Sequence, residues 1–420
     1  MHPRNLFTFN SKAAKAAQRQ QNSSQLTPDN LDHSLDGSSD PAQSATPLRQ
    51  QLRSALATSF WFCCALASFD AAINLLFPYP KDPLETAPKA LSLYFDYGRS
   101  LEGKVARQIG STDETSALIA QAGWLGDLPN PAEPKQPKPG HHLISLYGMS
   151  FVGNLAEAIH DLDPSLDMRL HLGPASPPNH TFAAYQRDRG QQQADIVVFG
   201  ILASSVRGMD AVSGMNLLTD FPAPFTFPHY ELQQGKLVEI APKVQSLADL
   251  RQAFQDPQQQ QAFAAQMQQY DRFFDSFIYE QNLLDRSAML RMIRRAWAKT
   301  HQEQVESQIH DRQGFKPNWP QVPVLKAMVA EFAATARADG KRPLVILFND
   351  RGFDDHLYQL LQPTLEANQI PYFSTHETAP ATDGSNFVGD GHFTEAANHK
   401  LAEKALSVIQ QELRQADRQP

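Results

Sequence analysis

Residues 142–154 read His-Leu-Ile-Ser-Leu-Tyr-Gly-Met-Ser-Phe-Val-Gly-Asn. An apolar segment of strand length runs into a small-residue turn at Gly148, and a helical pattern begins at Ser150. A strand, a tight turn and a helix are the parts from which parallel α/β sheets are built. The stretch therefore predicts an α/β fold in which Ser150 follows the carboxyl end of the first sheet strand.

Four further short apolar runs follow, and helical patterns lie between most of them. This alternation predicts a parallel sheet covered by helices on both faces, with ligands bound outside the carboxyl ends of the strands. Ser150 and His392, which follow the first and fifth runs, are then expected at the same rim of the sheet. The predicted strands are residues 143–147, 168–172, 196–201, 344–348 and 370–374.

A second motif, Gly389-Asp-Gly-His392, precedes the last predicted helix. A serine hydroxyl is a weak nucleophile until a base takes its proton, and a third group must hold that base in one tautomer. With one glycine between them, Asp390 can fold back onto Nδ1 of His392 and leave Nε2 facing Ser150. A serine after a strand more often caps a helix, but the second motif favours catalysis. We predict Ser150 as nucleophile, His392 as base and Asp390 as the orienting carboxylate.

From about residue 143 to residue 413 these motifs resemble the blocks of the SGNH (GDSL-like) hydrolase superfamily. Gly148-Met-Ser150 resembles the first block and Asp390-Gly-His392 the last, while Gly173 and Gly200 match glycines after the second and third strands. The resemblance implies a flavodoxin-like three-layer α/β/α sandwich and ester hydrolysis or acyl transfer through an acyl-serine. It also implies an oxyanion hole made of the Ser150 amide, a glycine amide and an asparagine side chain.

The chain departs from that family pattern in two places. Met149 replaces the usual aspartate, and the usual Gly-x-Asn-Asp block reads Gly-Ile-Leu-Ala-Ser-Ser over residues 200–205. Loss of one oxyanion donor typically costs about 100-fold to 1000-fold in turnover, so another group should fill the role. The candidates are Asn179, Ser204 and Ser205, although Asn179 is equally explained as a helix cap.

Residues 205–322 interrupt the alternation and are predicted to be an insertion that forms a lid or side wall over the rim. Residues 225–244 resemble a hairpin that turns at Gln234-Gly235. Aromatic and Met residues at helical spacing then predict a core-facing stripe rather than a cofactor site. The stripe consists of Phe263, Met267, Tyr270, Phe274 and Phe277.

Three arginines, Arg291, Arg294 and Arg295, follow on one predicted helix. They could face an anionic ligand, but a solvated helix face is the more common explanation of such a pattern.

The N-terminal part of the chain divides into a polar tail and an apolar segment. Residues 1–53 are rich in Gln, Ser, Asn and Pro, which predicts a disordered tail. Residues 54–78 contain one charge, Asp70, and end at Pro78, which predicts a single transmembrane helix. The alternatives are a buried core helix and, less favoured because of the long tail before it, a cleaved signal peptide.

Flanking charges determine orientation weakly, but the basic residues of the tail favour a cytoplasmic N-terminus. The rest of the chain is then extracytoplasmic, on the periplasmic side if the protein is bacterial. Residues 79–140 are predicted to connect the anchor to the main domain at 141–415, with a helix over 100–122 and a stiff proline-rich linker over 129–139.

Composition narrows the classes of partner. The chain has 37 basic and 45 acidic residues, a formal net charge of −8, and no basic run, which argues against nucleic acid. Its two cysteines, Cys63 and Cys64, are adjacent in the apolar segment, so neither a disulfide framework nor a cysteine metal site is predicted. The histidines lack metal-ligand spacing and no phosphate-binding glycine loop is present, so we predict no cofactor and no metal.

We therefore expect a membrane-anchored serine esterase or O-acyltransferase that acts on an extracytoplasmic acylated substrate, with carbohydrate favoured. The short Asp-x-His motif resembles that of related, often membrane-tethered enzymes that acetylate exported polysaccharides. The alternative is a catalytically inactive scaffold or accessory protein of envelope or polysaccharide assembly, which the altered block at Gly200 favours. The sequence leaves the acyl group, the acceptor and the oligomeric state open.

Overall fold

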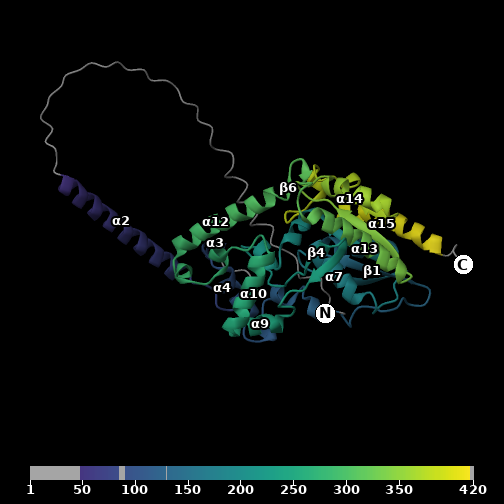
Figure 1. The fold of residues 1–420 in the computed structure, drawn as a ribbon, viewed down its shortest axis with the longest axis horizontal. Coiled ribbons are helices and arrows are strands. Elements are labelled where there is room, and N and C mark those ends of the chain that lie inside the picture. The colour runs from purple at the N-terminus through teal and green to yellow at the C-terminus, as the bar shows by residue number, and fades with distance from the viewer. Residues whose placement is uncertain (1–47, 85–89, 129, 417–420) are drawn as a thin grey trace, which may run out of the picture.

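A computed structural model describes residues 48–84, 90–128 and 130–416 of the chain. These residues form a central five-stranded parallel sheet, two small antiparallel hairpins and the helices around them (Figure 1). The predicted mixed α/β fold with a central parallel sheet is therefore confirmed. Residues 1–47 of the predicted disordered tail lie outside the described residues.

The central sheet has the strand order β2-β1-β3-β8-β9, and every neighbouring pair is parallel. Each of the five predicted strands is present, with ends that differ by at most two residues from the prediction. Their apolar, β-branched sequences suit strands that are buried on both faces. The strands are β1 (His142–Gly148), β2 (Leu166–Leu172), β3 (Ile196–Leu202), β8 (Arg342–Phe348) and β9 (Tyr372–Ser374).

Helices cover both faces of the sheet. Side chains alternate along each strand, so Ile144 and Leu146 belong to one hydrophobic cluster while Leu143 and Tyr147 belong to the other. One cluster includes α6 (Ser150–Leu162) and α15 (Glu395–Ala416), and the other includes α7 (Pro178–Asp188), α13 (Gln321–Ala338) and α14 (His356–Ala367).

Two glycines let α6 approach the sheet closely. A Cβ atom added at Gly148 or Gly200 would lie 2.4 or 2.2 Å from Cγ2 of Val152, the third residue of α6. Such distances are far shorter than a van der Waals contact, so only glycine fits at both strand positions while Val152 stays in place. The close approach sets the position of the first turn of α6, and with it that of Ser150.

The predicted insertion lies between β3 and α13. Its first hairpin turns at Gln234-Gly235 as predicted, with both residues at positive φ (53° and 79°). In the predicted aromatic stripe, Phe263 and Met267 are buried. The insertion contains η3 (Ala203–Asp210), α8 (Gly214–Leu217), β4 (His229–Gln233), β5 (Lys236–Ile240), α9 (Leu247–Gln255), α10 (Pro257–Tyr270), α11 (Ser276–Tyr279), η4 (Leu283–Arg286), α12 (Ala288–Ser307), β6 (His310–Asp311) and β7 (Gly314–Phe315).

The prediction of a solvated arginine face on α12 was wrong for two of its three residues. Arg291 and Arg294 are only 2% and 1% exposed. Nη1 of Arg294 donates to Oδ1 of Asp285 at 2.5 Å, and Arg291 donates to the carbonyl oxygens of Phe95 and Asp285. These contacts satisfy guanidinium groups that would otherwise be costly to bury. Arg295 is partly exposed and pairs with Asp220.

The region before the sheet is folded against it. The helix predicted over residues 100–122 is interrupted, because Gly110 at φ 58° ends the first helix. Leu101, Val105 and Trp124 join the same hydrophobic cluster as Tyr147. The elements are α3 (Ala90–Asp96), α4 (Leu101–Ile109), η1 (Asp113–Thr115), α5 (Leu118–Gln121) and η2 (Leu125–Asp127).

The proline-rich segment that follows forms no helix or strand over residues 130–141. It covers the open edge of β2, where the carboxylate of Glu133 accepts a hydrogen bond from the Leu170 amide. Lys138 also binds the Asp167 carboxylate through its backbone and side-chain nitrogens. An exposed strand edge is a template for unwanted pairing, and these contacts occupy it.

Helix α2 (Leu48–Leu76) projects from one end of the molecule (Figure 1). Residues 50–76 are long and apolar enough to cross a membrane, and only 6% of the most apolar window is buried. The alternative of a buried core helix is therefore excluded for most of α2. Its last turns contact the globular part through α12.

Candidate functional site

A cavity of about 350 Å³ lies at the carboxyl-end rim of the sheet. Segments that follow all five strands line it, as expected for a ligand site in a parallel α/β sheet. Its volume is within the range that small-molecule sites occupy. The lining residues are Met149 and Phe151 after β1, Ala175 after β2, Leu202 at the end of β3, Ser204, Ser205, Arg207, Gly214, Leu217 and Leu218 after β3, Asp350 and Arg351 after β8, and Asp390, Gly391 and His392 after β9.

Ser150 and His392 meet beside this cavity. Ser150 Oγ lies 2.6 Å from His392 Nε2, a hydrogen-bond distance. Ser150 is the first residue of α6, between the lining residues Met149 and Phe151. The predicted nucleophile and base are thus in the geometry required for transfer of the hydroxyl proton.

Asp390 orients His392 from within the same loop. Its Oδ1 atom lies 3.1 Å from His392 Nδ1 and also accepts from the backbone N–H of His392 at 3.1 Å. Gly391 has φ 94°, a backbone conformation that allows the carboxylate to turn back onto the ring. The His392 ring stacks on Phe151, with ring centroids 4.8 Å apart. Carboxylate and phenyl ring together hold the imidazole with Nε2 toward Ser150.

Ser204 and Ser205 both line the cavity, and the Ser205 hydroxyl is bonded to the protein. Ser205 Oγ donates to the carbonyl oxygen of Leu202 at 2.8 Å. Ser204 neighbours the carboxylate of Asp350 and lowers its pKa. The Ser205 hydroxyl would have to give up its bond to Leu202 to donate to an oxyanion.

Gly173, Asn179 and Gly200 are absent from the cavity lining. The Gly173 amide donates to the carbonyl oxygen of Gly148 at 3.0 Å. Asn179 is 1% exposed and donates from Nδ2 to the carbonyl oxygen of Pro228; it lies within α7, whose N-cap is Pro177. Gly200 is paired with Ile346 inside the sheet, where it makes room for Val152.

The Ser150 amide is a candidate oxyanion donor on other grounds. The first N–H groups of a helix have no partner within the helix, and the helix dipole adds partial positive charge there. Because Ser150 opens α6, its own N–H belongs to this set. A carbonyl oxygen bound next to Ser150 Oγ would meet that positive end.

Asp350 is a buried carboxyl group in the cavity wall. It is 9% exposed, and its Oδ1 atom has no hydrogen-bond partner in the described part of the chain. Burial raises the pKa of Asp350 to about 6, although the neighbouring Ser204 and the Arg207 charge oppose the rise. A shifted carboxyl group in a cavity is a recurring property of functional sites.

Arg207 and Arg351 give the same cavity two guanidinium groups. Arg207, which the sequence analysis did not identify, pairs with Glu306 of the insertion, and Arg351 donates to the carbonyl oxygens of Phe387 and Val388. Arg207, Gly214 and two leucines place the insertion in the wall of the cavity, as the predicted side wall requires. No motif in the sequence marks Arg207, because its position depends on how η3 folds after β3.

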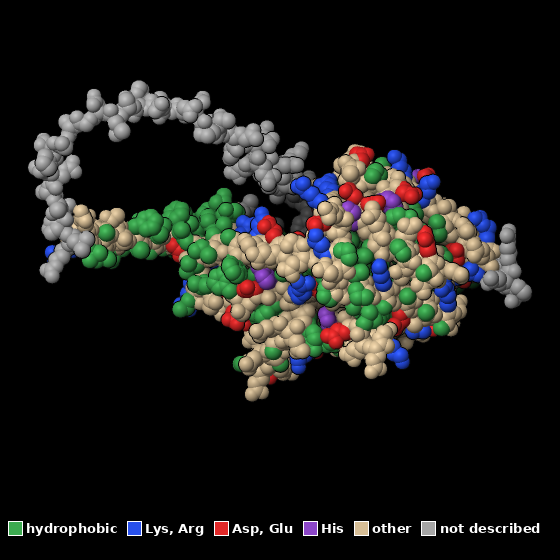
Figure 2. Space-filling view, turned by 45° about the horizontal axis from the view of Figure 1, so that its top comes forward, with side chains coloured by type: hydrophobic (Ala, Val, Ile, Leu, Met, Phe, Trp, Pro, Cys, Tyr) green, Lys and Arg blue, Asp and Glu red, His purple; other side chains and the backbone are tan. Residues whose placement is uncertain are grey.

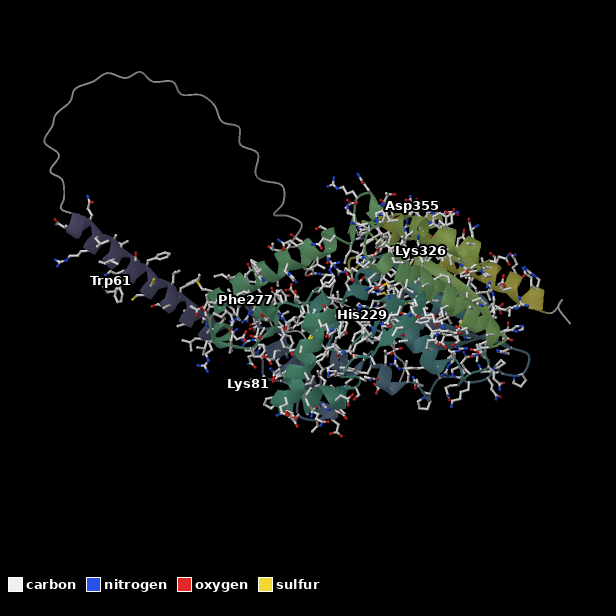
Figure 3. The ribbon with its side chains drawn as sticks, viewed as in Figure 1. Trp61, Lys81, His229, Phe277, Lys326 and Asp355 are labelled. Carbon is white, nitrogen blue, oxygen red and sulfur yellow. The ribbon has the colours of Figure 1, made fainter. Side chains whose placement is uncertain are left out.

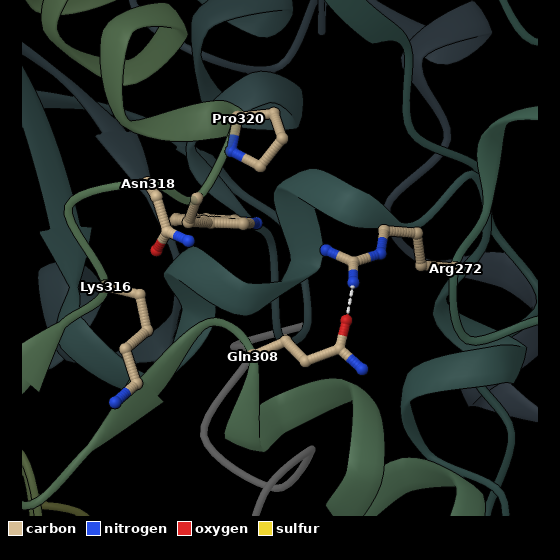
Figure 4. Close-up of a pocket in the computed structure, with 6 residues that line it drawn as sticks. Arg272, Gln308, Lys316, Asn318 and Pro320 are labelled. Carbon is tan, nitrogen blue, oxygen red and sulfur yellow. Dashed lines mark hydrogen bonds between the residues drawn. The ribbon is translucent and has the colours of Figure 1, made fainter.

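A second cavity, of about 460 Å³, lies away from these residues (Figure 4). Its wall combines polar side chains with Trp319 and Pro320, and Arg272 donates to the side-chain oxygen of Gln308 within it. Arg272 also pairs with Asp210, and Lys316 pairs with Asp311, so its cations already have partners. It contains no nucleophile or base pair comparable to Ser150 and His392.

Within the described ranges, no three or more His, Cys, Asp or Glu side chains are arranged to hold a metal ion. Comparisons of the chain with protein-family models, curated proteins and solved structures find no match.

Proposed function

We propose that this protein is a serine-dependent ester hydrolase or O-acyltransferase that acts on an acylated substrate, with carbohydrate as the favoured class. The observation that carries the proposal is the continuous chain of contacts from Ser150 Oγ to His392 Nε2 and from His392 Nδ1 to Asp390. A hydroxyl, an imidazole and a carboxylate in this order are the parts of a nucleophilic triad.

In the proposed reaction, His392 Nε2 takes the hydroxyl proton as Ser150 Oγ bonds to the carbonyl carbon of the ester. The bond to the alcohol oxygen then breaks, His392 returns the proton to that oxygen, and an acyl-serine remains. Water or a hydroxyl group of an acceptor then attacks the acyl-serine while His392 takes its proton, the bond to Ser150 Oγ breaks, and His392 returns the proton to Oγ. Asp390 stabilises the imidazolium in both halves, and the Ser150 amide stabilises negative charge on the carbonyl oxygen.

The topology supports the resemblance to SGNH hydrolases. Counted along the chain, the five sheet strands lie in the order 2-1-3-4-5, which is the order of flavodoxin-like folds. Helices on both faces are consistent with the three-layer sandwich of that class. We therefore propose the SGNH hydrolase fold for residues 141–415, with the insertion as an addition to it.

The cavity lining supports a small acyl group attached to a polar alcohol. Met149, Leu202 and Leu217 offer apolar surface, while Asp350 and Arg351 offer an acceptor and a donor. A sugar hydroxyl could donate to the Asp350 carboxylate, which is part of the cavity wall. We propose that the polar side of the cavity holds the alcohol part of the ester, and that α2 anchors the protein in a membrane with the globular part extracytoplasmic.

One observation favours the second candidate, an inactive scaffold of envelope or polysaccharide assembly. The Gly173 amide is bonded to Gly148, and no asparagine side chain lines the cavity, so two of the family's three oxyanion donors are not in place. A protein that kept the triad but lost these donors would retain binding and lose most turnover.

Hydrolysis of p-nitrophenyl acetate and labelling by a fluorophosphonate probe, both on the full chain in detergent, distinguish the two candidates. The variants are Ser150→Ala and, as a matched control, Ser165→Ala, an exposed serine before β2. Loss of hydrolysis and labelling in Ser150→Ala alone supports the acyl-enzyme. Folded wild-type protein that shows neither reaction would contradict an active triad and favour the scaffold.

A further inference from the structure

The first half of helix α12 has the reverse of the usual distribution of side chains. Its inward face carries the buried Arg291 and Arg294, while its outward face carries Leu290, Ile293 and Trp297, of which Ile293 is 59% and Trp297 52% exposed. A helix on a water-soluble surface normally turns its apolar stripe inward and its charges outward. The surroundings of this first half of α12 are therefore expected to be apolar.

The exposed apolar residues of α12 are continuous with those of α2. Leu75 and Leu76 at the end of α2 are largely exposed, and so are Leu91 and Tyr94 of the neighbouring α3. Figure 2 shows hydrophobic side chains that run along α2 and continue onto the end of the globular part that α2 joins. Exposed apolar surface of this extent is uncommon on a soluble monomer and marks an interaction surface. We call the exposed residues Met289, Leu290, Ile293 and Trp297 of α12 the apolar face.

Polar contacts fix α2 to α12 at a defined place. Oδ1 of Asp70 accepts hydrogen bonds from the Ser287 hydroxyl at 3.1 Å and from the Met289 amide at 2.9 Å, at the start of α12. One turn later, Asn74 Oδ1 accepts from Arg291 at 3.1 Å. The single acidic residue of α2 thus binds the positive end of α12, which explains a charge in an otherwise apolar segment.

The length of α2 indicates where a bilayer would end. No charged residue lies between Arg53 and Asp70, and residues 54–69 span about 24 Å of helix. A hydrocarbon core is about 30 Å thick, so about 6 Å remains to be covered beyond Asp70. An interfacial helix buries its apolar face by about 5–10 Å, which matches this remainder.

The direction of α12 suits that role. Figure 1 shows α12 beginning where α2 ends and running across the direction of α2 rather than beside it. Trp297 is the type of residue that anchors proteins at the membrane surface, and its indole N–H donates back to Asp275 at 3.1 Å. Figure 3 shows Trp61 projecting from α2 and Phe277, which packs edge-on against Trp297, near the junction with the globular part.

We propose that the apolar face of α12 is a second membrane contact, seated in the interface between lipid headgroups and acyl chains. This inference rests on the proposed membrane anchoring by α2. It implies that the globular part is held against the bilayer in one orientation, so that its cavity faces substrates at a fixed distance from the membrane.

The test uses the full chain in vesicles of phosphatidylcholine and phosphatidylglycerol, with Cys63 and Cys64 replaced by serine. An environment-sensitive NBD fluorophore is attached in turn to Ile293→Cys, to Phe60→Cys in α2 and to the control Gln304→Cys, which is exposed on the last turns of α12. Quenching is measured with lipids that carry a doxyl group near the headgroup or deep in the acyl chain.

We expect blue-shifted emission and shallow-doxyl quenching at position 293, deep quenching at position 60, and neither at position 304. Water-like emission at 293 beside a quenched label at 60 would leave the anchor in place and overturn the inference about α12. Blue-shifted emission at 293 without lipid quenching would overturn it in favour of a protein partner or a second copy. An unquenched label at position 60 would overturn the anchor and the inference together.

Discussion

Ser150 Oγ and His392 Nε2 are 2.6 Å apart although 242 positions separate the two residues in the chain. Ser150 follows β1 and His392 lies in the loop after β9. Because parallel strands all end at the same rim, the sheet topology brings two distant motifs into hydrogen-bond contact. The local Asp-Gly-His sequence then supplies the third group without another long-range contact.

The first prediction concerns the orienting carboxylate. We expect Asp390→Asn to lower kcat for p-nitrophenyl acetate by about 10²-fold to 10⁴-fold, because an amide can stabilise the wrong imidazole tautomer. KM should change little. Steady-state kinetics on the purified full chain measures both values.

The matched control is Asp383→Asn. Asp383 lies in the same loop, where its carboxylate accepts from the Ser385 amide and hydroxyl and does not line the cavity. Equal losses in the two variants would indicate that the loop, rather than the Asp390 carboxylate, affects the rate.

The sheet and the core of the candidate site could be predicted from sequence because each depends on a local pattern. Short apolar runs identify strands that are buried on both faces, and a serine directly after one of them is placed at the rim by topology alone. Long-range packing could not be predicted. Gly200 matches a family motif, yet in the structure it makes room for Val152.

Helix α12 shows why the burial of Arg291 and Arg294 could not be predicted from sequence. Helical spacing identifies which residues share a face but not which face is turned inward. Arg294 points inward because Asp285, from the preceding turn, is buried there as its partner. Neither the three-residue spacing of Arg291 and Arg294 nor the composition of the chain reveals such a partner.

The second prediction concerns Gly200. We expect Gly200→Ala to destabilise the protein by about 1–3 kcal/mol, because the new methyl group would overlap Val152 Cγ2. Gly200→Ala should lower the free energy of unfolding less in a Val152→Ala background than in the wild type, because Val152→Ala removes the methyl group that the new side chain overlaps. Urea unfolding of the four proteins of this double-mutant cycle gives the coupling energy. If the two changes were simply additive, the steric explanation would fail.

The third prediction concerns Asp350 and pH. Burial raises its pKa to about 6 from the usual value near 4, so the folded state favours the protonated carboxyl. Its contribution to stability is fully present below about pH 4 and is lost as the pH rises through about 6. Asp350→Asn, which stays neutral, should therefore be more stable than the wild type by roughly 2–3 kcal/mol above pH 7, and about equal to it near pH 4.

Unfolding by urea at pH 4, 6 and 8 measures this difference. If Asp350 also binds the alcohol part of a carbohydrate ester, the same variant should raise KM for that ester more than for p-nitrophenyl acetate. A stability difference that is independent of pH would contradict the proposed titration.

The last prediction compares two ion pairs on the same helix. Asp285 is buried, and it accepts from Arg294 and from both the amide and the hydroxyl of Ser100. Removing one partner of a buried pair leaves an uncompensated charge and typically costs about 3–5 kcal/mol. Asp220 and Arg295 form a second pair on α12 that is partly exposed, and such pairs are usually worth less than about 1 kcal/mol. We therefore expect Asp285→Ala to lower the free energy of unfolding several times more than Asp220→Ala.

Added salt distinguishes the two pairs further. Screening reaches exposed charges but barely affects buried ones, so the Asp220→Ala effect should shrink in high salt while the Asp285→Ala effect persists. Urea unfolding of the full chain in detergent, at low and high sodium chloride, gives both comparisons. Asp285 joins α4, through Ser100, to the first turns of α12. Its loss should therefore also weaken the contacts between α12 and the end of α2. Equal and salt-sensitive effects of the two substitutions would mean that Asp285 is solvated in the folded protein, and that the inward-facing arginines of α12 are not held by a buried partner.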